Sequence, residues 1–275
     1  MAIATETIFK PHAFSGYLAR PERATALPAV VVIQEAWGVD AHIQDVTRRF
    51  AAAGYLALAP DLFADPKAGT RPAPLEPERM TELVAFVNAS PTTNVFADAA
   101  AREAALGKLP GPERTRVGES LDALRGALMD PARREGLLAI TQAAVAYLRE
   151  ERSETRGRKI ASVGFCVGGA LSAMLACRDA QLGAAVIFYG NAPAAEEIPK
   201  IRCPVLGLYG GADARILAGL PAFVDAMKAG GKRFEHVVYD GVGHAFFNDG
   251  RPTYDVGAAR DGFARVLAFL QSSLT

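Results

Sequence analysis

The chain has 275 residues, of which half are hydrophobic and 22% are charged. This composition excludes an intrinsically disordered protein, because it can bury a large apolar core. Thirty basic and thirty acidic residues cancel to a formal net charge of zero, so we expect no nucleic-acid binding, which requires a basic excess. Three cysteines without a C-x-x-C pair predict neither a disulfide framework nor a structural zinc site, and we expect no metal and no cofactor.

The first residues have no basic segment followed by an apolar one, as a secretory signal would. We therefore expect a cytoplasmic protein with reduced thiols. One uncharged stretch, 160–177, is near the lower length limit for a membrane-spanning helix. Its first half is strand-like, its second half is helix-like, and glycines and serines interrupt it. It predicts a buried strand-turn-helix, and we expect no membrane association.

Apolar runs alternate with amphipathic helical patterns along the chain. The predicted strands are 5–10, 14–19, 29–34, 55–59, 159–164, 184–189, 204–209 and 233–239. The predicted helices are 41–53, 78–89, 114–129, 131–150, 166–177, 217–229 and 253–274. The first two strands are expected to form an edge hairpin. The alternation predicts an α/β fold with a mostly parallel central sheet flanked by helices.

The region 64–135 differs from the rest of the chain. It begins with a proline-rich loop and continues with helices, where a single crossover helix would be enough to join two parallel strands. We therefore predict one domain over 1–275, in which 64–135 is a helical insertion or a lid.

The sequence G-F-C-V-G-G at 164–169 carries the strongest chemical signal. It follows a predicted strand and opens a helix, which is the arrangement of a nucleophile elbow with Cys166 at its apex. The sharp turn requires small neighbours, and the helix amino terminus favours a thiolate and a developing oxyanion. The alternative is a buried structural cysteine, an interpretation that we assign to Cys177 and Cys203.

A nucleophilic cysteine needs a base and an acid. His244 lies in a glycine-rich loop just beyond the last predicted strand, at the carboxyl edge of the sheet. Asp213 follows the preceding strand at the same edge, so these two side chains are the predicted partners. Among the other candidates, His12 and His42 are expected at the surface, His236 within a strand, Asp179 and Asp225 beside helices, and Asp240 in a turn.

A second acid, Glu35, directly follows the apolar run of 29–34, next to Trp37, the single tryptophan of the chain. A carboxylate at the end of such a strand lies at the active edge of a parallel sheet. A solvated loop glutamate is the alternative interpretation.

Five motifs together resemble the dienelactone hydrolase family of α/β-hydrolases. They are Q-E-A-W-G-V at 34–39, A-P-D-L-F at 59–63, G-F-C-V-G-G at 164–169, Y-G-G-A-D at 209–213 and G-H-A-F-F at 243–247. The resemblance implies an α/β-hydrolase fold and a triad of Cys166, His244 and Asp213. It also implies that Glu35 helps to deprotonate the thiol when substrate binds, and that the amides of Val167 and Ala36 form an oxyanion hole.

The implied substrates are lactones or esters of carboxylic acids. Members of the family bind the substrate carboxylate with an arginine four residues after the histidine, a position that is Asn248 here. Arg251 is the nearby alternative, and Arg71 and Arg79 are candidates for a second arginine in the region 64–135. We include Trp37 among the expected substrate contacts.

These observations predict a cofactor-free hydrolase of esters or lactones that acts through an acyl-enzyme on Cys166. Two alternatives use the same triad, a general carboxylesterase and a small-peptide hydrolase. A third is a non-catalytic scaffold, which would not need an intact triad.

Overall fold

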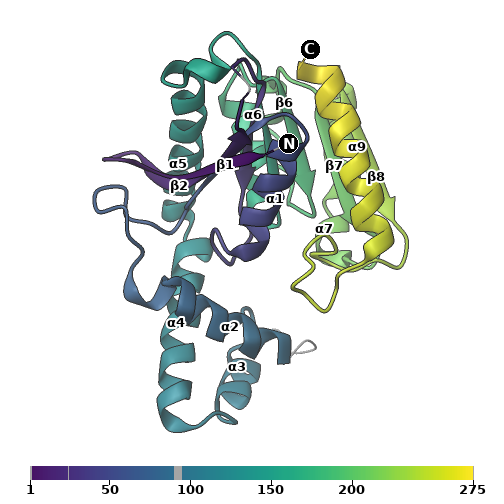
Figure 1. Cartoon of the computed structure of the whole chain (residues 1–275). Coiled ribbons are helices and arrows are strands. Elements are labelled where there is room, and N and C mark those ends of the chain that lie inside the picture. Colours follow the sequence, from purple (N-terminus) through teal and green to yellow (C-terminus); the bar gives the residue numbers. More distant parts are fainter. Residues whose placement is uncertain (1, 24, 90–94, 275) are drawn as a thin grey trace.

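The computed structural model describes residues 2–23, 25–89 and 95–274, and its strands form one mixed sheet (Figure 1). Within these residues the strand order is β1-β2-β4-β3-β5-β6-β7-β8. The strands are β1 Ile3–Lys10, β2 Phe14–Pro21, β3 Ala29–Ile33, β4 Leu56–Pro60, β5 Ile160–Phe165, β6 Ala184–Phe188, β7 Val205–Gly210 and β8 Phe234–Tyr239. β1 and β2 form an antiparallel hairpin, β2 is antiparallel to β4, and the other pairs are parallel. The predicted mostly parallel sheet is confirmed.

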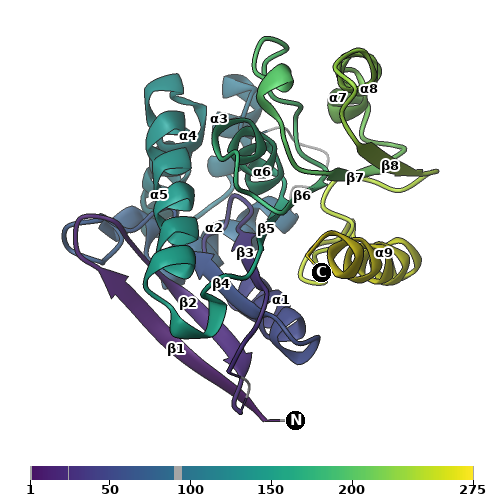
Figure 2. The ribbon, with the colours of Figure 1, turned by 90° about the horizontal axis from the view of Figure 1, so that it is seen from above.

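Helices cover both faces of this sheet. They are α1 Ala41–Ala52, α2 Pro77–Ala89, α3 Ala99–Leu106, α4 Gly111–Met129, α5 Pro131–Glu150, α6 Val167–Arg178, α7 Ala214–Leu217, α8 Leu220–Ala229 and α9 Val256–Leu274. α1 and α9 lie on one face, and α5, α6 and α8 lie on the other (Figure 2). In the described part of the chain, no helix combines the length and the hydropathy needed to cross a membrane.

β3 shows how the sequence fixes the two layers. All five of its side chains are buried, and they alternate between the two apolar clusters of the molecule. Val30 and Val32 pack with the α1 and α9 side, whereas Val31 and Ile33 pack with the α5 and α6 side. Burial of each such side chain contributes about 1.5–3 kcal/mol. The carboxyl end of this strand, where Glu35 follows, is therefore held firmly.

The segment between β4 and α5 contains a short 3-10 helix, Ala73–Leu75, followed by α2, α3 and α4. These helices gather beyond the carboxyl end of the sheet (Figure 1). Ion pairs join α2 to α4, Glu82 to Arg116 at 2.6 Å and Arg79 to Glu119 at 2.9 Å. Helix α3 was not predicted, although its alanine-rich sequence is a good helix former.

The predicted helix 217–229 corresponds to α8, which begins three residues later than predicted, and the short helix α7 before it was not predicted. α7 ends at Leu217 and α8 begins at Leu220, with Gly219 as its N-cap residue. Pro221 occupies the first turn of α8. A proline has no N–H to donate to the preceding turn and its ring collides with the carbonyl four residues earlier, so one continuous helix cannot pass through this point.

Candidate active site

Cys166 occupies a strained turn between β5 and α6. Its φ of 54° and ψ of −114° lie outside the regions that L-residues favour, and its N–H donates to the carbonyl of Phe188 at 3.0 Å. A Cβ atom on Gly164 would overlap the carbonyl of Gly168, and one on Gly168 would overlap the carbonyl of Ile33. The glycines of the motif are thus required by backbone contacts, and they leave the thiol partly exposed at the apex.

His244 and Asp213 lie in neighbouring loops that the backbone ties together. The amide of Ala212 donates to the carbonyl of Val242 at 2.9 Å. A Cβ atom on Gly210 would lie 2.5 Å from the carbonyl oxygen of Gly243, so only glycine allows this approach. Through this contact the Nδ1–H of His244 donates to Oδ2 of Asp213 at 2.5 Å.

The electrostatics of this pair favour a charged imidazole. Burial favours the neutral ring, but hydrogen bonds with Asp213 and Cys166 outweigh it and raise the pKa of His244 to about 10. Burial also opposes ionisation of Asp213, yet the hydrogen bond from His244 lowers the pKa of that carboxyl. The raised pKa of His244 and the lowered pKa of Asp213 favour an aspartate–imidazolium ion pair, with Cys166 next to it.

Glu35 is 2% exposed and is held by two side chains from distant parts of the chain. The hydroxyl of Tyr189 donates to its Oε1 at 2.9 Å, and Nδ2 of Asn248 donates to its Oε2 at 2.5 Å. The ring of Tyr189 also lies 5.1 Å from that of His244, centroid to centroid. Burial first, and then the neighbouring carboxylate of Glu35, raise the pKa of Tyr189. Tyr189 therefore links the carboxylate of Glu35 to the Cys166–His244–Asp213 cluster.

The oxyanion hole expected from the sequence consists of two backbone amides. Val167 is the first residue of α6, where an N–H has no partner within its own helix. Ala36 follows Glu35 at the end of β3. Within the ranges that the structure covers, neither amide donates a hydrogen bond to another protein group outside regular helix and strand pairing.

The expected substrate contacts fall into two groups. Arg71 donates to Asp61 at 2.7 Å and is 6% exposed at the side chain, and Arg79 is bound to Glu119 in the insertion. Asn248 is engaged with Glu35. Arg251 lies over Trp37, with its guanidinium carbon 4.8 Å from the ring centroid.

Arg251 is distinguished from the other two arginines by its lack of a carboxylate partner among the described side chains, and its buried Nη1 has no hydrogen-bond partner there. Burial lowers the pKa of Arg251, although the charges of Glu35 and Cys166 act in the opposite direction.

The remaining cysteines and histidines are not part of this cluster. Cys177 and Cys203 are buried, and burial raises the pKa of their thiols to about 11 and about 12. The expectation that His42 lies at the surface is wrong. Its side chain is 5% exposed, and its ring packs against Phe165 and Phe247 while Nδ1 bonds to Asp249 at 3.0 Å.

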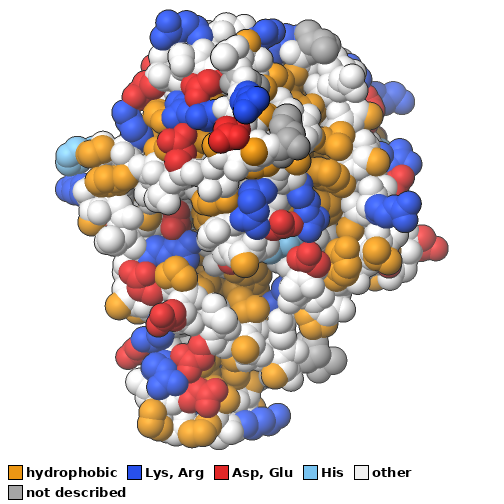
Figure 3. Space-filling view, in the orientation of Figure 1, with side chains coloured by type: hydrophobic (Ala, Val, Ile, Leu, Met, Phe, Trp, Pro, Cys, Tyr) orange, Lys and Arg blue, Asp and Glu red, His pale blue; other side chains and the backbone are white. Residues whose placement is uncertain are grey.

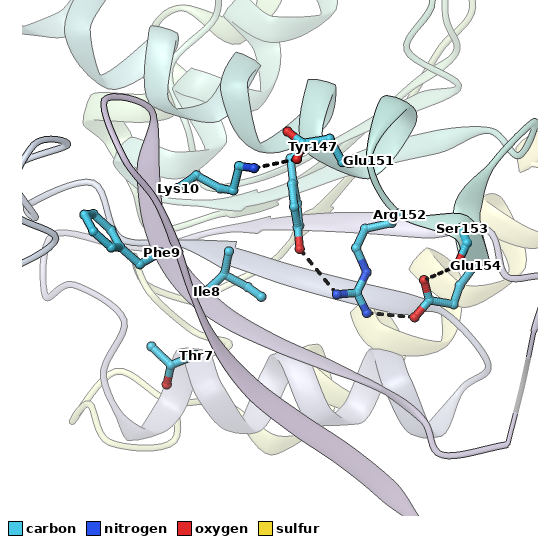
Figure 4. A pocket seen from close by; sticks show the side chains of 9 residues that line it. All are labelled: Thr7, Ile8, Phe9, Lys10, Tyr147, Glu151, Arg152, Ser153 and Glu154. Carbon is cyan, nitrogen blue, oxygen red and sulfur yellow. Dashed lines mark hydrogen bonds and ion pairs between the residues drawn. The ribbon is translucent and has the colours of Figure 1, made fainter.

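A different pocket lies at the edge of the sheet formed by β1 and the end of α5 (Figure 4). Its charged side chains neutralise one another. Lys10 pairs with Glu151 at 2.5 Å, and Arg152 pairs with Glu154 at 2.7 Å. None of Cys166, His244 and Asp213 lines this pocket, so the site predicted from the sequence lies elsewhere, at the carboxyl edge of the sheet.

The strand order, the turn at Cys166 and the loops that carry His244 and Asp213 define a protein of the α/β-hydrolase fold. A crystal structure of a Klebsiella pneumoniae protein described as "Putative Dienelactone Hydrolase" superposes on this chain with a TM-score of 0.71. The two sequences are 27% identical, and the match covers 98% of this chain and 99% of the other.

The model of the "Dienelactone hydrolase family" matches residues 14–274. A Saccharolobus solfataricus protein named "Putative carboxymethylenebutenolidase" is 34% identical over 93% of this chain and 92% of its own length. A Salmonella typhimurium protein of the same name is 31% identical over 91% of this chain and 80% of its own length. The chain belongs to the dienelactone hydrolase family and is a hydrolase.

Proposed function

We propose that this hydrolase cleaves esters or lactones, dienelactone-like compounds among them, through nucleophilic attack by Cys166. The observation that carries the proposal is the 2.5 Å hydrogen bond between His244 and Asp213, in loops beside the strained turn of Cys166. The name of the two relatives supports a lactone as substrate. A nucleophile at an elbow, a base and an orienting acid are the three groups that acyl transfer needs.

Glu35 offers a second acceptor for the thiol proton besides His244, whose ring Asp213 and Cys166 favour in the protonated form. We propose that the carboxylate of Glu35 takes this proton when substrate binds. Tyr189 and Asn248 hold that carboxylate by one hydrogen bond to each oxygen.

The reaction then proceeds in two halves. The sulfur of Cys166 attacks the carbonyl carbon, and the amides of Ala36 and Val167 stabilise the oxyanion. When the tetrahedral intermediate collapses, His244 gives its proton to the leaving oxygen, and a thioester remains on Cys166. Neutral His244 next takes a proton from water, which attacks the thioester. The acid product leaves, and Glu35 returns its proton to the thiolate.

Arg251 is our proposed contact for an anionic group of the substrate. It is the arginine near Glu35 whose charge no described carboxylate pairs, whereas Arg71 and Arg79 are bound to Asp61 and Glu119. A partner for its buried Nη1 would satisfy a group whose isolation is costly. The reduced thiol that the mechanism needs also supports a cytoplasmic location.

The general carboxylesterase and the small-peptide hydrolase remain as alternatives on the same residues. A panel of lactones, aryl esters and short peptides separates them by kcat/KM, and we expect lactones and activated esters to be cleaved and peptides not to be.

Mass spectrometry after brief exposure to an activated ester is the direct test of the mechanism. We expect one acyl adduct, on Cys166, and none in the Cys166→Ala variant. Cys177 and Cys203 are internal controls, because burial raises the pKa of their thiols and leaves little thiolate at neutral pH. Unchanged ester hydrolysis after full alkylation of Cys166 would contradict the proposal, whereas the absence of both an adduct and any hydrolysis would favour the non-catalytic scaffold.

A further inference from the structure

A pocket of about 610 Å³ lies between α1, α2 and the segment 248–251. Its walls include the apolar side chains of Trp37, Val39, Met80 and Val84. The surface is hollowed and hydrophobic between the α2–α4 helices and the body of the molecule (Figure 3). Neither Cys166 nor His244 lines this pocket, so it is distinct from the reacting atoms.

The pocket nevertheless shares a wall with the proposed site. Trp37 directly follows Ala36, whose amide is one arm of the proposed oxyanion hole. Asn248, which lines the pocket, is also the side chain that holds Oε2 of Glu35. The pocket and the proposed site therefore adjoin at Trp37 and Asn248.

The charged side chains around the pocket are mostly paired with one another. Arg71 pairs with Asp61 at 2.7 Å, Arg48 with Asp45 at 3.3 Å, and His42 with Asp249 at 3.0 Å. An apolar ligand can enter without separating these three pairs, and Arg251, which also lines the pocket, stays available for the anionic group proposed above. The apolar walls would then gain by burial against it.

We propose that this pocket binds the acyl chain of the substrate, so that the enzyme prefers esters whose acid half carries a hydrophobic chain of medium length. The inference rests on the proposed function of Cys166. The acyl half is favoured because its carbonyl oxygen binds at the amide of Ala36, whose neighbour Trp37 lines the pocket. Most of the lining comes from the residues after β3, from α1 and from α2, and the segment 248–251, which follows His244, closes one side.

The test compares two ester series on the wild-type enzyme. The first consists of nitrophenyl esters from acetate to octanoate, and the second of alkyl acetates from ethyl to octyl. Burial of one methylene corresponds to about a fourfold gain in kcat/KM. We expect this gain per carbon along the acyl series until the pocket is filled, and no systematic gain along the alkyl series.

Two variants fill the pocket, Met80→Trp and Val84→Trp, so that the test does not depend on the folding of one of them. Each is expected to lower kcat/KM on the octanoate by at least tenfold and to leave the acetate within about twofold of wild type. Met129→Trp is the matched control, because Met129 is 60% exposed at the end of α4 and does not line the pocket. It should retain the wild-type profile.

Three results would each overturn the inference while leaving Cys166 as the nucleophile. They are equal kcat/KM along the acyl series, a gain along the alkyl series instead, and equal losses on acetate and octanoate in both variants. Failure of the proposed function has a different signature, which is the absence of an acyl adduct on Cys166 with every ester of both series.

Discussion

The turn at Cys166 and the helices α2–α4 are held by different kinds of contact. At the turn, the backbones of β3, β5 and α6 approach so closely that Gly164 and Gly168 have no room for a Cβ atom. Between α2 and α4, long exposed side chains such as Glu82 and Arg116 form the polar links. Backbone contacts fix positions to a fraction of an ångström, whereas exposed ion pairs contribute little and tolerate exchange.

This difference separates chemistry from selectivity. Substitutions at the turn and its partner loops should affect all substrates alike, because they move the reacting atoms. Substitutions in α2 should act on the preference between substrates, because α2 contributes only the wall of the adjacent pocket. The following predictions compare substitutions at the turn and its partner loops with substitutions in the helices α2–α4.

The largest effect is expected from Asp213→Asn, which keeps the size of the side chain and removes its charge. Without the carboxylate, His244 loses the ion pair and its fixed orientation, and we expect kcat to fall by about 10³- to 10⁴-fold on every ester. Steady-state kinetics on an acetate and an octanoate check this. A loss confined to one of them would contradict the idea of a common reacting centre.

The same substitution has a pH signature in stability. The folded-state pKa of His244, about 10, exceeds its ordinary 6.5, so the ion pair stabilises the fold fully below pH 6.5 and ceases to do so as the pH rises through 10. The pKa of Asp213 is lowered below its ordinary 3.8, so that contribution is lost only in stronger acid. Urea unfolding should show the largest difference between wild type and Asp213→Asn near pH 4–6.5, and a smaller one at pH 10.

Gly168→Ala should destabilise the fold by about 3 kcal/mol or prevent folding. The new methyl group would overlap the backbone carbonyl of Ile33, which cannot move without disturbing the centre of the sheet. Urea denaturation gives the free energy of unfolding directly. A loss below about 1 kcal/mol would mean that the turn is less tightly packed than the backbone contacts indicate.

Glu35→Gln should lower kcat/KM by about 100-fold and change its pH dependence. The carboxylate accepts hydrogen bonds from Tyr189 and Asn248, and a glutamine can keep both contacts by donating to the Tyr189 hydroxyl, so the substitution tests the charge. A pH–rate profile on one ester is the measurement. Glu235→Gln, exposed on β8, is the matched control and should behave as wild type. Identical profiles for wild type and Glu35→Gln would remove Glu35 from the mechanism.

The smallest effect is expected in the tolerant region. Gly126 lies on the exposed face inside α4, and a Cβ atom there would meet nothing within 4 Å. Gly126→Ala should therefore stabilise the protein by about 1 kcal/mol through helix propensity, with unchanged turnover. Urea denaturation measures this gain. Destabilisation would indicate that a methyl group at position 126 does collide with neighbouring atoms.

The sheet was predictable because its signals are local. Short apolar runs bounded by glycine or proline define the strands, and the residues that follow these runs must meet at one edge of a parallel sheet. That rule placed Cys166, Asp213, His244 and Glu35 together, as the structure does. The same rule applies to Tyr189, which ends the predicted strand 184–189. Its aromatic ring makes it look like one more apolar residue of that strand, so it was not singled out from the sequence.

What the sequence did not predict depends on partners that are distant along the chain. From the sequence, Arg71 and Arg79 are equally good candidates for a substrate-binding arginine. Only the folded structure shows that they pair with Asp61 and Glu119. His42 looked exposed because it lies near the start of a helix. Phe247, more than two hundred positions away, packs against its ring.

The hydrogen bond between Glu35 and Asn248 joins residues 213 positions apart. During folding this contact closes nearly the whole chain into one loop, so we expect it to form late, after the hairpin and the local strand-helix units. Trp37, the single tryptophan, lies under Arg251 in the segment that brings Asn248 into position. Its fluorescence can therefore follow the arrival of the carboxyl-terminal segment during refolding, and recovery of enzymatic turnover should coincide with the slowest phase of that signal.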